Sequence, residues 1–282
     1  MTHVPRVAVV TDSTAEFDDR VPSTLGITIV PLTVNWGRDV LRDGIDITSE
    51  EFYIRLRLDR DIPKTSAPPI GILEDLYRQL LTVHDAVISI HISSRLSSTY
   101  EVARGAARAV DASRVHVVDS RSVSLGVGWL AQQAAELARE DMAADQILDA
   151  LTDMPRRERI YFAVDTLEYL QRGGRIGRAQ TFLGGLLNVK PILQCRDGEV
   201  HPLERVRTRA ASLRRLLDLA AHAGNVERVG VVHADCLEEA KQLSSAVRER
   251  LKVSEVPVVE LGPVIGTHAG PGVIGIGLLL AA

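Results

Sequence analysis

Cysteine is scarce in this 282-residue chain, which contains only Cys195 and Cys236. Two thiols so far apart form no disulfide framework, so we expect buried free cysteines and a reducing, cytoplasmic location. Long apolar runs are also missing, because the longest, Gly272–Ala282, is shorter than the about 20 residues that span a bilayer. The first residues show no charged and then apolar leader, so we expect no secretion.

An excess of positive charge is absent as well. The net charge is -4, and only four of the 33 cationic residues are lysines. Proteins that bind nucleic acid neutralise its phosphates with a basic surface, so we expect no nucleic-acid partner. The sequence also has no P-loop, no GxSxG elbow, no HExxH and no paired CxxC. We therefore expect neither a cofactor nor a metal.

A GxGxxA pattern at Gly126–Ala131 is the one feature typical of dinucleotide binding. No acidic residue ends a strand about 20 positions further on, as that kind of site requires. We interpret these glycines as positions where a helix packs closely.

Short β-branched runs alternate with helical patterns along the first half of the chain. The runs that predict strands are Arg6–Thr11, Gly26–Val34, Ala86–His91 and Val115–Val118. Thr48 and Glu51 form a capping-box pattern that predicts the start of a helix. This alternation favours an α/β fold with a mostly parallel sheet flanked by helices.

The polar stretch Pro155–Arg159 predicts a boundary between a domain of residues 1–157 and a second α/β domain of residues 158–282. In the second domain we expect a helix near Ala179–Leu187 and a hairpin turn at Asp197-Gly198.

Three hydroxyl-rich loops lie next to predicted strands or helix starts: Asp12–Thr14, Thr65-Ser66 and Ser93–Thr99. Helix N-termini carry free amides and partial positive charge, so hydroxyls there can help to hold an anion such as a carboxylate. Taken singly, each loop is explained by helix capping. Three of them at one edge of a sheet favour a binding site.

His268 lies in a glycine-rich segment, Gly266–Gly272, which we interpret as a loop that approaches a ligand closely. A surface histidine in a turn is the alternative. Three aspartates that end predicted strands, Asp12, Asp119 and Asp165, are acid–base candidates, although capping explains each of them. The segment His233–Cys236 could provide a metal ligand or a thiol nucleophile. A strand end followed by a capping aspartate explains it more simply.

Seven motifs, found in order from one end of the chain to the other, resemble the DegV family. They are Val10-Thr-Asp-Ser-Thr14, Lys64-Thr-Ser-Ala-Pro68, Ile92-Ser-Ser-Arg-Leu-Ser-Ser-Thr-Tyr100, Val118-Asp-Ser120, Leu167-Glu-Tyr-Leu-Gln-Arg-Gly-Gly-Arg-Ile176, Lys190-Pro-Ile192 and Gly266-Thr-His-Ala-Gly-Pro-Gly272. Each motif by itself is short, but the order of all seven is specific.

The resemblance implies two α/β domains, the C-terminal one smaller and with a mixed sheet, and one long-chain fatty acid between them. Thr65, Ser97 and His268 would bind the carboxylate, with Ser66 and Ser98 beside them. Many relatives have glycine where Ser98 stands, so either Ser97 or Ser98 faces the carboxylate. The segments Phe182–Ile192 and Val273–Leu280 would line the acyl tunnel, or else form plain core.

The resemblance also implies a partner. Such proteins present the fatty acid to a separate kinase subunit, which phosphorylates it to an acyl phosphate for phospholipid synthesis, and transient contact with a membrane surface is expected. Arg175 would lie at the mouth of the cleft, facing this partner. The protein itself is then no enzyme. Two alternatives stay open: a lipid carrier or sensor without a kinase, and an acyl hydrolase that uses Ser97 and His268.

Overall fold

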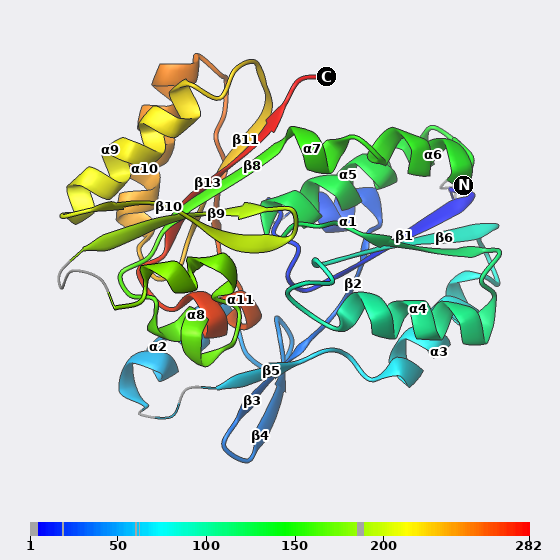
Figure 1. The fold of residues 1–282 in the computed structure, drawn as a ribbon. Coiled ribbons are helices and arrows are strands. Elements are labelled where there is room, and N and C mark those ends of the chain that lie inside the picture. The colour runs from blue at the N-terminus through cyan, green and yellow to red at the C-terminus, as the bar shows by residue number, and fades with distance from the viewer. Residues whose placement is uncertain (1–4, 19, 60, 62, 185–188) are drawn as a thin grey trace.

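Three sheets organise the part of the chain that the computed structural model describes, residues 5–18, 20–59, 61, 63–184 and 189–282. A parallel sheet and a larger mixed sheet each form an α/β lobe, and a small antiparallel sheet lies below and between them (Figure 1). The two-lobed α/β fold predicted from the sequence is confirmed. The domain boundary at residue 157 stays a prediction.

The parallel sheet has the strand order β2-β1-β6-β7. Its strands are β1 (Val7–Asp12), β2 (Thr28–Val30), β6 (Ala86–His91) and β7 (Val115–Asp119). Side chains alternate between its two faces, and both faces are buried, as the continuous apolar runs predict. Val7 and Val9 pack in one apolar cluster, whereas Ala8 and Val10 pack in another on the opposite face.

Helices cover both faces of this sheet (Figure 1). On one side lie α3 (Ile70–Leu80) and α4 (Thr99–Val110). On the other side lie α1 (Val21–Leu25), α5 (Leu125–Arg139), α6 (Ala144–Leu151) and α7 (Met154–Arg157). Helix α5 is the most deeply buried of these, because it packs against β1 and also reaches the mixed sheet at β13.

The mixed sheet has the order β10-β9-β8-β13-β11-β12. Its strands are β8 (Glu158–Ala163), β9 (Lys190–Arg196), β10 (Glu199–Val206), β11 (Val226–His233), β12 (Val258–Glu260) and β13 (Ile274–Leu280). Helices α9 (Arg209–Ala221) and α10 (Leu237–Leu251) cover its outer face. The predicted hairpin is confirmed, and Asp197 and Gly198 both have the positive φ of a tight hairpin turn.

The antiparallel sheet was not predicted. It consists of β3 (Thr33–Trp36), β4 (Asp39–Arg42) and β5 (Lys64–Ser66). Helix α2 (Ser49–Leu58) lies between β4 and β5 in the chain. The single strand predicted at Gly26–Val34 is wrong, since the chain divides it into β2 and β3 around Pro31, which has no N–H for a ladder. The predicted capping box is confirmed, because Thr48 N donates to Glu51 and Glu51 N donates to Thr48 Oγ1.

Three short helices remain: α8 (Glu168–Arg172), the 3-10 helix η1 (Gly177–Phe182) and α11 (Pro263–Ala269). Helix α11 contacts α2, β3 and β5 of the first half of the chain. The helix predicted near Ala179–Leu187 is shorter and begins earlier, and residues 185–188 lie outside the described residues. The loop predicted around His268 is also corrected, because His268 lies in the last turn of α11.

The glycines at the start of α5 permit close packing, as the sequence predicted. A Cβ at Gly128 would lie 2.1 Å from the backbone oxygen of Glu16, and a Cβ at Gly126 would lie 2.1 Å from Glu158 and Ser122. Real Cβ atoms do not come so close to other atoms. Helix α5 therefore approaches the backbone of the β1–α1 loop because Gly128 has no side chain, and it approaches the side chains of Ser122 and Glu158 because Gly126 has none.

We expect Gly128→Ala to destabilise the protein by about 1–3 kcal/mol, because its Cβ must displace backbone rather than a flexible side chain. Gly71→Ala in α3 is the matched control, since nothing lies within 4 Å of a Cβ there. Chemical denaturation of both variants measures the difference. Equal stability of the two variants would contradict this account of α5.

Candidate functional site

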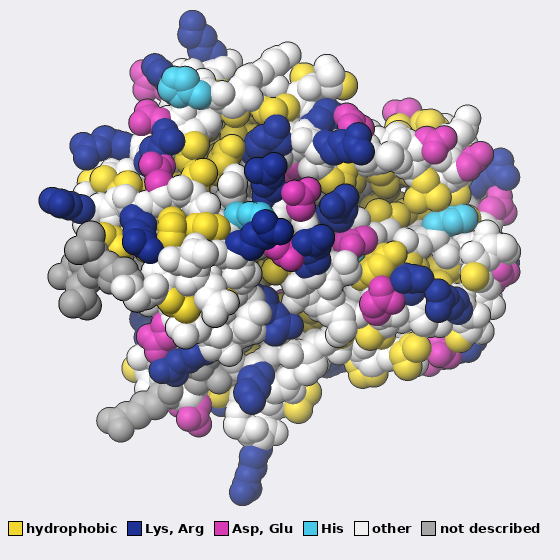
Figure 2. Space-filling view, viewed as in Figure 1, with side chains coloured by type: hydrophobic (Ala, Val, Ile, Leu, Met, Phe, Trp, Pro, Cys, Tyr) yellow, Lys and Arg dark blue, Asp and Glu magenta, His cyan; other side chains and the backbone are white. Residues whose placement is uncertain are grey.

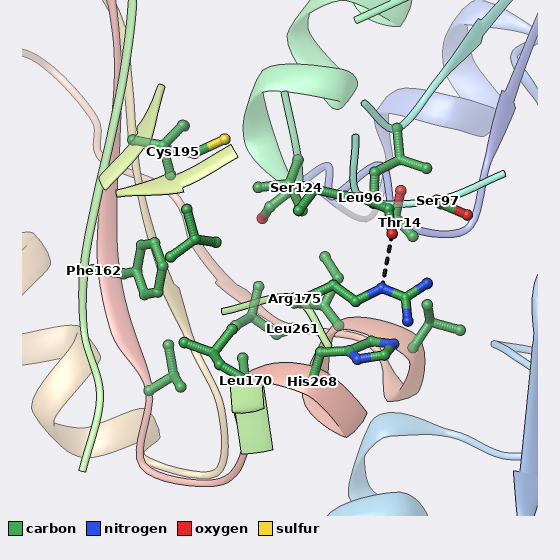
Figure 3. A pocket seen from close by; sticks show the side chains of 18 of the residues that line it. Thr14, Leu96, Ser97, Ser124, Phe162, Leu170, Arg175, Cys195, Leu261 and His268 are labelled. Atoms are coloured by element: carbon green, nitrogen blue, oxygen red, sulfur yellow. Dashed lines mark hydrogen bonds between the residues drawn. The ribbon is translucent and has the colours of Figure 1, made fainter. Parts of the chain in front are cut away.

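A cavity of about 830 Å³, including its opening to solvent, lies between the loops of the parallel sheet and the inner face of the mixed sheet (Figure 3). Both halves of the chain contribute to the wall, and the cavity therefore exists only in the folded, two-lobed protein.

Most of the wall is apolar. The apolar side chains come from the mixed sheet, from loops, from α8 and from α11: Leu32, Ile92, Leu96, Val123, Ile160, Phe162, Leu170, Val200, Val232, Leu261, Val264, Ile265, Ala269 and Val273. Of the two predicted tunnel segments, only Val273 contributes among the described residues, whereas Ile274 and Ile276 belong to the core under α9 and α10. Strand β13 is central in its sheet, so its alternate side chains point away from the cavity.

The polar groups of the wall include three residues that the sequence singled out. Thr65 from β5, Ser97 from the loop before α4 and His268 from α11 all line the same cavity. Thr65 Oγ1 and His268 Nε2 are hydrogen-bonded at 2.8 Å, although 203 residues separate them in the chain. Arg175 lines the cavity beside them (Figure 3).

His268 is neutral at physiological pH. Burial and then the positive charge of Arg175 lower the pKa of His268 to about 4. Its Nδ1 is buried and has no hydrogen-bond partner. A neutral imidazole can donate or accept a hydrogen bond at each nitrogen, depending on its tautomer.

Gly173 packs against His268, a contact that the sequence did not predict. A Cβ at this position would lie 2.2 Å from His268 Nδ1, so only glycine lets the end of α8 approach the imidazole. The Gly173-Gly174 pair in the family motif was the available signal, but a pair of glycines predicts only a turn.

The predicted serines differ in where they lie. Ser97 Oγ is hydrogen-bonded to Thr99 Oγ1 at 2.8 Å, and Ser98 is exposed at the N-cap of α4. Ser66 is exposed and accepts a hydrogen bond from Asn35 Nδ2 at 2.8 Å. The structure therefore brings Ser97 into the cavity wall and leaves Ser66 and Ser98 outside it.

Arg175 is held in place by backbone oxygens. Its Nε donates to Leu96 O at 2.9 Å, drawn as a dashed line in Figure 3, and its Nη1 donates to Gly173 O at 2.7 Å. The guanidinium is therefore fixed across the gap between the two lobes, since Leu96 belongs to the first half of the chain and Gly173 to the second.

Thr14 connects the cavity wall to a buried polar network. Its hydroxyl donates to Asp12, which also accepts from Ile92 N at 3.0 Å and contacts His91 Nδ1 at 2.9 Å. Burial would raise the pKa of Asp12, but His91, Thr14 and the Ile92 amide outweigh it and lower the pKa. Asp12 is therefore a structural carboxylate that fixes the first hydroxyl loop; it does not cap a helix, since the N-cap residue of α1 is Arg20.

Helix α11, which carries His268, is held at its other end by two carboxyls of the first lobe. Glu16 Oε1 accepts a hydrogen bond from Gly262 N at 2.8 Å, and Asp43 accepts one from Val264 N. Burial raises the pKa of Glu16 to about 8 and that of Asp43 to about 7, although these hydrogen bonds oppose it. Both groups therefore hold a proton over much of the neutral range.

The other candidates have structural roles. Asp119 accepts hydrogen bonds from Ser94, and Asp165 pairs with Lys190 Nζ at 2.8 Å. Both cysteines are free, but the prediction that they are buried needs correction, because Cys195 lines the cavity and Cys236 is only half-buried. Over the described ranges, no group of three His, Cys, Asp or Glu side chains could hold a metal ion. None of the helices traced there is long and apolar enough to cross a membrane.

Basic side chains gather around the middle of the face shown in Figure 2. A depression there is lined by Arg95, Arg121, Arg178, Arg196, Asp197 and His201. Arg95 and Arg178 both pair with Glu199, at 2.7 Å and 3.5 Å. Arg95 directly precedes Leu96 of the cavity wall, so this mixed charge network adjoins the cavity.

Known proteins resemble this chain over nearly its whole length. The family model described as "Uncharacterised protein, DegV family" matches residues 6–281. Protein DegV of Bacillus subtilis is 39% identical over 274 residues, which make up 96% of this chain and 98% of the relative.

Two solved structures share the fold. One, described as fatty acid binding of a DegV family protein from Thermus thermophilus, is 36% identical with a TM-score of 0.92 and covers 98% of this chain and 100% of that one. Another, a stearic acid-binding protein from Eubacterium ventriosum, is 29% identical with a TM-score of 0.90 and covers 97% and 98%.

We expect the wild-type protein to lose thermal stability between pH 6.5 and 8.5, and Glu16→Gln to lose less. A carboxyl whose pKa is raised on folding stabilises the protein fully below its unfolded pKa, and this contribution is lost as the pH rises through the folded pKa of about 8. His268 and His233 have lowered pKa values, so their contribution to stability rises with pH, but only up to the unfolded pKa of about 6.5. Glutamine can still accept the Gly262 amide. Melting temperatures measured across this range test the expectation, and parallel curves would contradict it.

Proposed function

Since the chain belongs to the DegV family, we propose that it binds one long-chain fatty acid in the cavity between its lobes. The observation that carries this proposal is the wall itself, an apolar cavity with Thr65, Ser97, His268 and Arg175 among its few polar side chains. The two relatives described as fatty acid or stearic acid binders share the fold over nearly the full chain.

The apolar wall suits an acyl chain. Each methylene group removed from water contributes about 0.8 kcal/mol, so a long chain reaches tight binding after the loss of translational and rotational freedom is subtracted. Strand residues such as Ile160, Phe162 and Val232 would contact the chain from the mixed sheet. Such a ligand would stay bound through purification.

Thr65, Ser97 and His268 would hold the carboxylate. Hydroxyls and a neutral imidazole can donate hydrogen bonds to an anion without pairing both of its oxygens, as a bidentate arginine would. One carboxylate oxygen would then stay available to attack a phosphoryl donor. Ser66 and Ser98 are exposed, and we propose no direct contact for them in this state of the protein.

We further propose that a separate kinase subunit phosphorylates the bound acid to an acyl phosphate for phospholipid synthesis. Arg175, held between the lobes by hydrogen bonds to Leu96 O and Gly173 O, would then face this partner. The chain would need no metal or cofactor of its own, would act in the cytoplasm and would contact a membrane surface only transiently to exchange its ligand.

The geometry opposes the hydrolase alternative. A serine nucleophile needs a hydrogen bond to its general base, but Ser97 Oγ bonds to Thr99, whereas His268 Nε2 bonds to Thr65. A lipid carrier without a kinase would use the same cavity and differs only in what consumes the ligand.

Native mass spectrometry of the purified protein, followed by denaturation, should show one long-chain fatty acid per chain. The double variant Thr65→Ala/Ser97→Ala should lose most of it, because the carboxylate would lose two hydrogen-bond donors, each worth about 1.5–3 kcal/mol to a charged group. Ser66→Ala/Ser98→Ala is the matched control, with the neighbouring exposed hydroxyls removed, and should keep the ligand.

An empty wild-type protein that also takes up no added palmitate or oleate would refute the fatty-acid proposal. Equal ligand loss from both double variants would refute the assignment of the carboxylate site.

Loaded with oleate and mixed with a kinase subunit from its own host and ATP, the wild type should form acyl phosphate. His268→Ala should reduce this rate at least tenfold while still binding oleate, because the acyl chain supplies most of the affinity. An unchanged rate would exclude a role for His268 in presenting the carboxylate, and no product with any such kinase would favour the carrier alternative.

A further inference from the structure

Ser124 is a buried polar residue of the cavity wall for which the proposed function has no use. It lies at the N-cap of α5 and is 4% exposed. Its Oγ is buried and has no hydrogen-bond partner, although the residue lines the cavity. A serine at an N-cap ordinarily accepts a hydrogen bond from the first turn of its own helix, but this hydroxyl does not.

The backbone fixes the direction of this side chain. Ser124 has φ 59° and ψ −127°, a conformation that favours glycine over residues with a Cβ. Three interactions hold it there: Ser124 N donates to Thr14 O at 3.1 Å, Gly128 N donates to Ser124 O at 3.1 Å, and Ala15 and Ser124 form a parallel bridge. The loops on both sides therefore determine where the hydroxyl points.

The hydroxyl points into the apolar part of the cavity. In Figure 3 the oxygen of Ser124 is directed toward the side of Phe162, away from Ser97 and His268. The adjoining wall residues include Val123, Ile160 and Phe162, whose side chains have no hydrogen-bonding atoms. Leaving a buried hydroxyl unpaired is unfavourable, so the partner that this site lacks would come from a ligand.

The missing partner is an uncharged oxygen. The adjoining side chains of Val123, Ile160 and Phe162 supply no counter-charge for an ion, and the buried carboxyl near the start of α5, Glu158, already accepts a hydrogen bond from Ser122. Burying an unpaired charge is far less favourable than burying a neutral polar group. The N-terminus of α5 carries partial positive charge, which favours an oxygen atom there. A ligand hydroxyl can both donate and accept, so it matches either orientation of the Ser124 O–H.

We propose that Ser124 binds a hydroxyl group carried part-way along the acyl chain, so that the cavity prefers certain hydroxylated fatty acids to unsubstituted ones. This inference rests on the proposed function, because the carboxylate end defines how far along the chain Ser124 lies. The preferred position of the hydroxyl follows from that distance, and a hydroxyl placed elsewhere along the chain would not reach Ser124.

Displacement of a fluorescent fatty acid from delipidated protein measures this preference. The competitors are stearic acid and a series of hydroxystearic acids with the hydroxyl at successive positions from carbon 3 to carbon 12. For the wild type we expect one position, or two adjacent ones, to bind roughly tenfold tighter than the rest of the hydroxylated series, as one buried hydrogen bond predicts.

Ser124→Ala should abolish that positional preference while still binding stearic acid. Ser124→Gly removes the same hydroxyl and suits the positive φ, so it should fold at least as stably as the wild type and give the same result. Ser97→Ala is the control, because loss of a carboxylate contact should weaken all competitors by the same factor and leave the preference intact.

The outcomes separate this inference from the proposed function. If the wild type binds stearic acid but shows no preferred hydroxyl position, Ser124 serves a bound water at most and the inference is wrong. A preference that persists in Ser124→Ala and Ser124→Gly also overturns it. If the wild type binds none of the acids, the proposed function fails and the inference fails with it.

Discussion

The attachment of helix α11 to the first lobe is the constraint on which the rest of the site depends. Three hydrogen bonds hold the start of this helix. Tyr53 Oη donates to Leu261 O, Gly262 N donates to Glu16, and Val264 N donates to Asp43. At its end, His268 is bonded to Thr65. Because every one of these partners comes from the first quarter of the chain, the helix joins the lobes, and the cavity is the space that remains beside it.

Some buried polar atoms have a hydrogen-bond partner within the protein, and others have none. Asp12, His91, Ser89 and Tyr77 form a continuous hydrogen-bonded chain under the parallel sheet, and this chain holds Thr14 at the cavity wall. Within the described residues, the buried side-chain atoms without a partner include Ser124 Oγ and His268 Nδ1, and both of these residues line the cavity. Other such atoms, on Thr11, Trp36, Arg157 and Arg228, belong to residues outside the cavity wall, so a missing partner indicates a ligand position only where the residue also lines the cavity.

Sequence reasoning was most successful where the signal is local. The capping box at Thr48, the hairpin at Asp197-Gly198 and the packing glycines of α5 each depend on neighbouring residues or on the absence of a side chain, and all three were predicted. The single strand at Gly26–Val34 was predicted wrongly although its cause, Pro31, is itself local. The prediction for His268 failed because a distant contact decides: its glycine-rich neighbourhood forms a helix that is stabilised by packing of Gly266 on Phe52 and Tyr53.

The sequence by itself determined the α/β class, the family and the set of hydroxyl loops, because apolar periodicity, turn residues and ordered motifs are all written along the chain. It could not decide which hydroxyls share one cavity. Thr65 and Ser66 are adjacent, yet the alternation of β5 turns Thr65 toward His268 and Ser66 toward Asn35. Nor could it reveal Ser124, whose importance arises only from a hydroxyl left without a partner. Which hydroxyls share the cavity, and which hydroxyl has no partner, both depend on contacts between residues that are far apart in the chain. Only the tertiary structure determines these contacts.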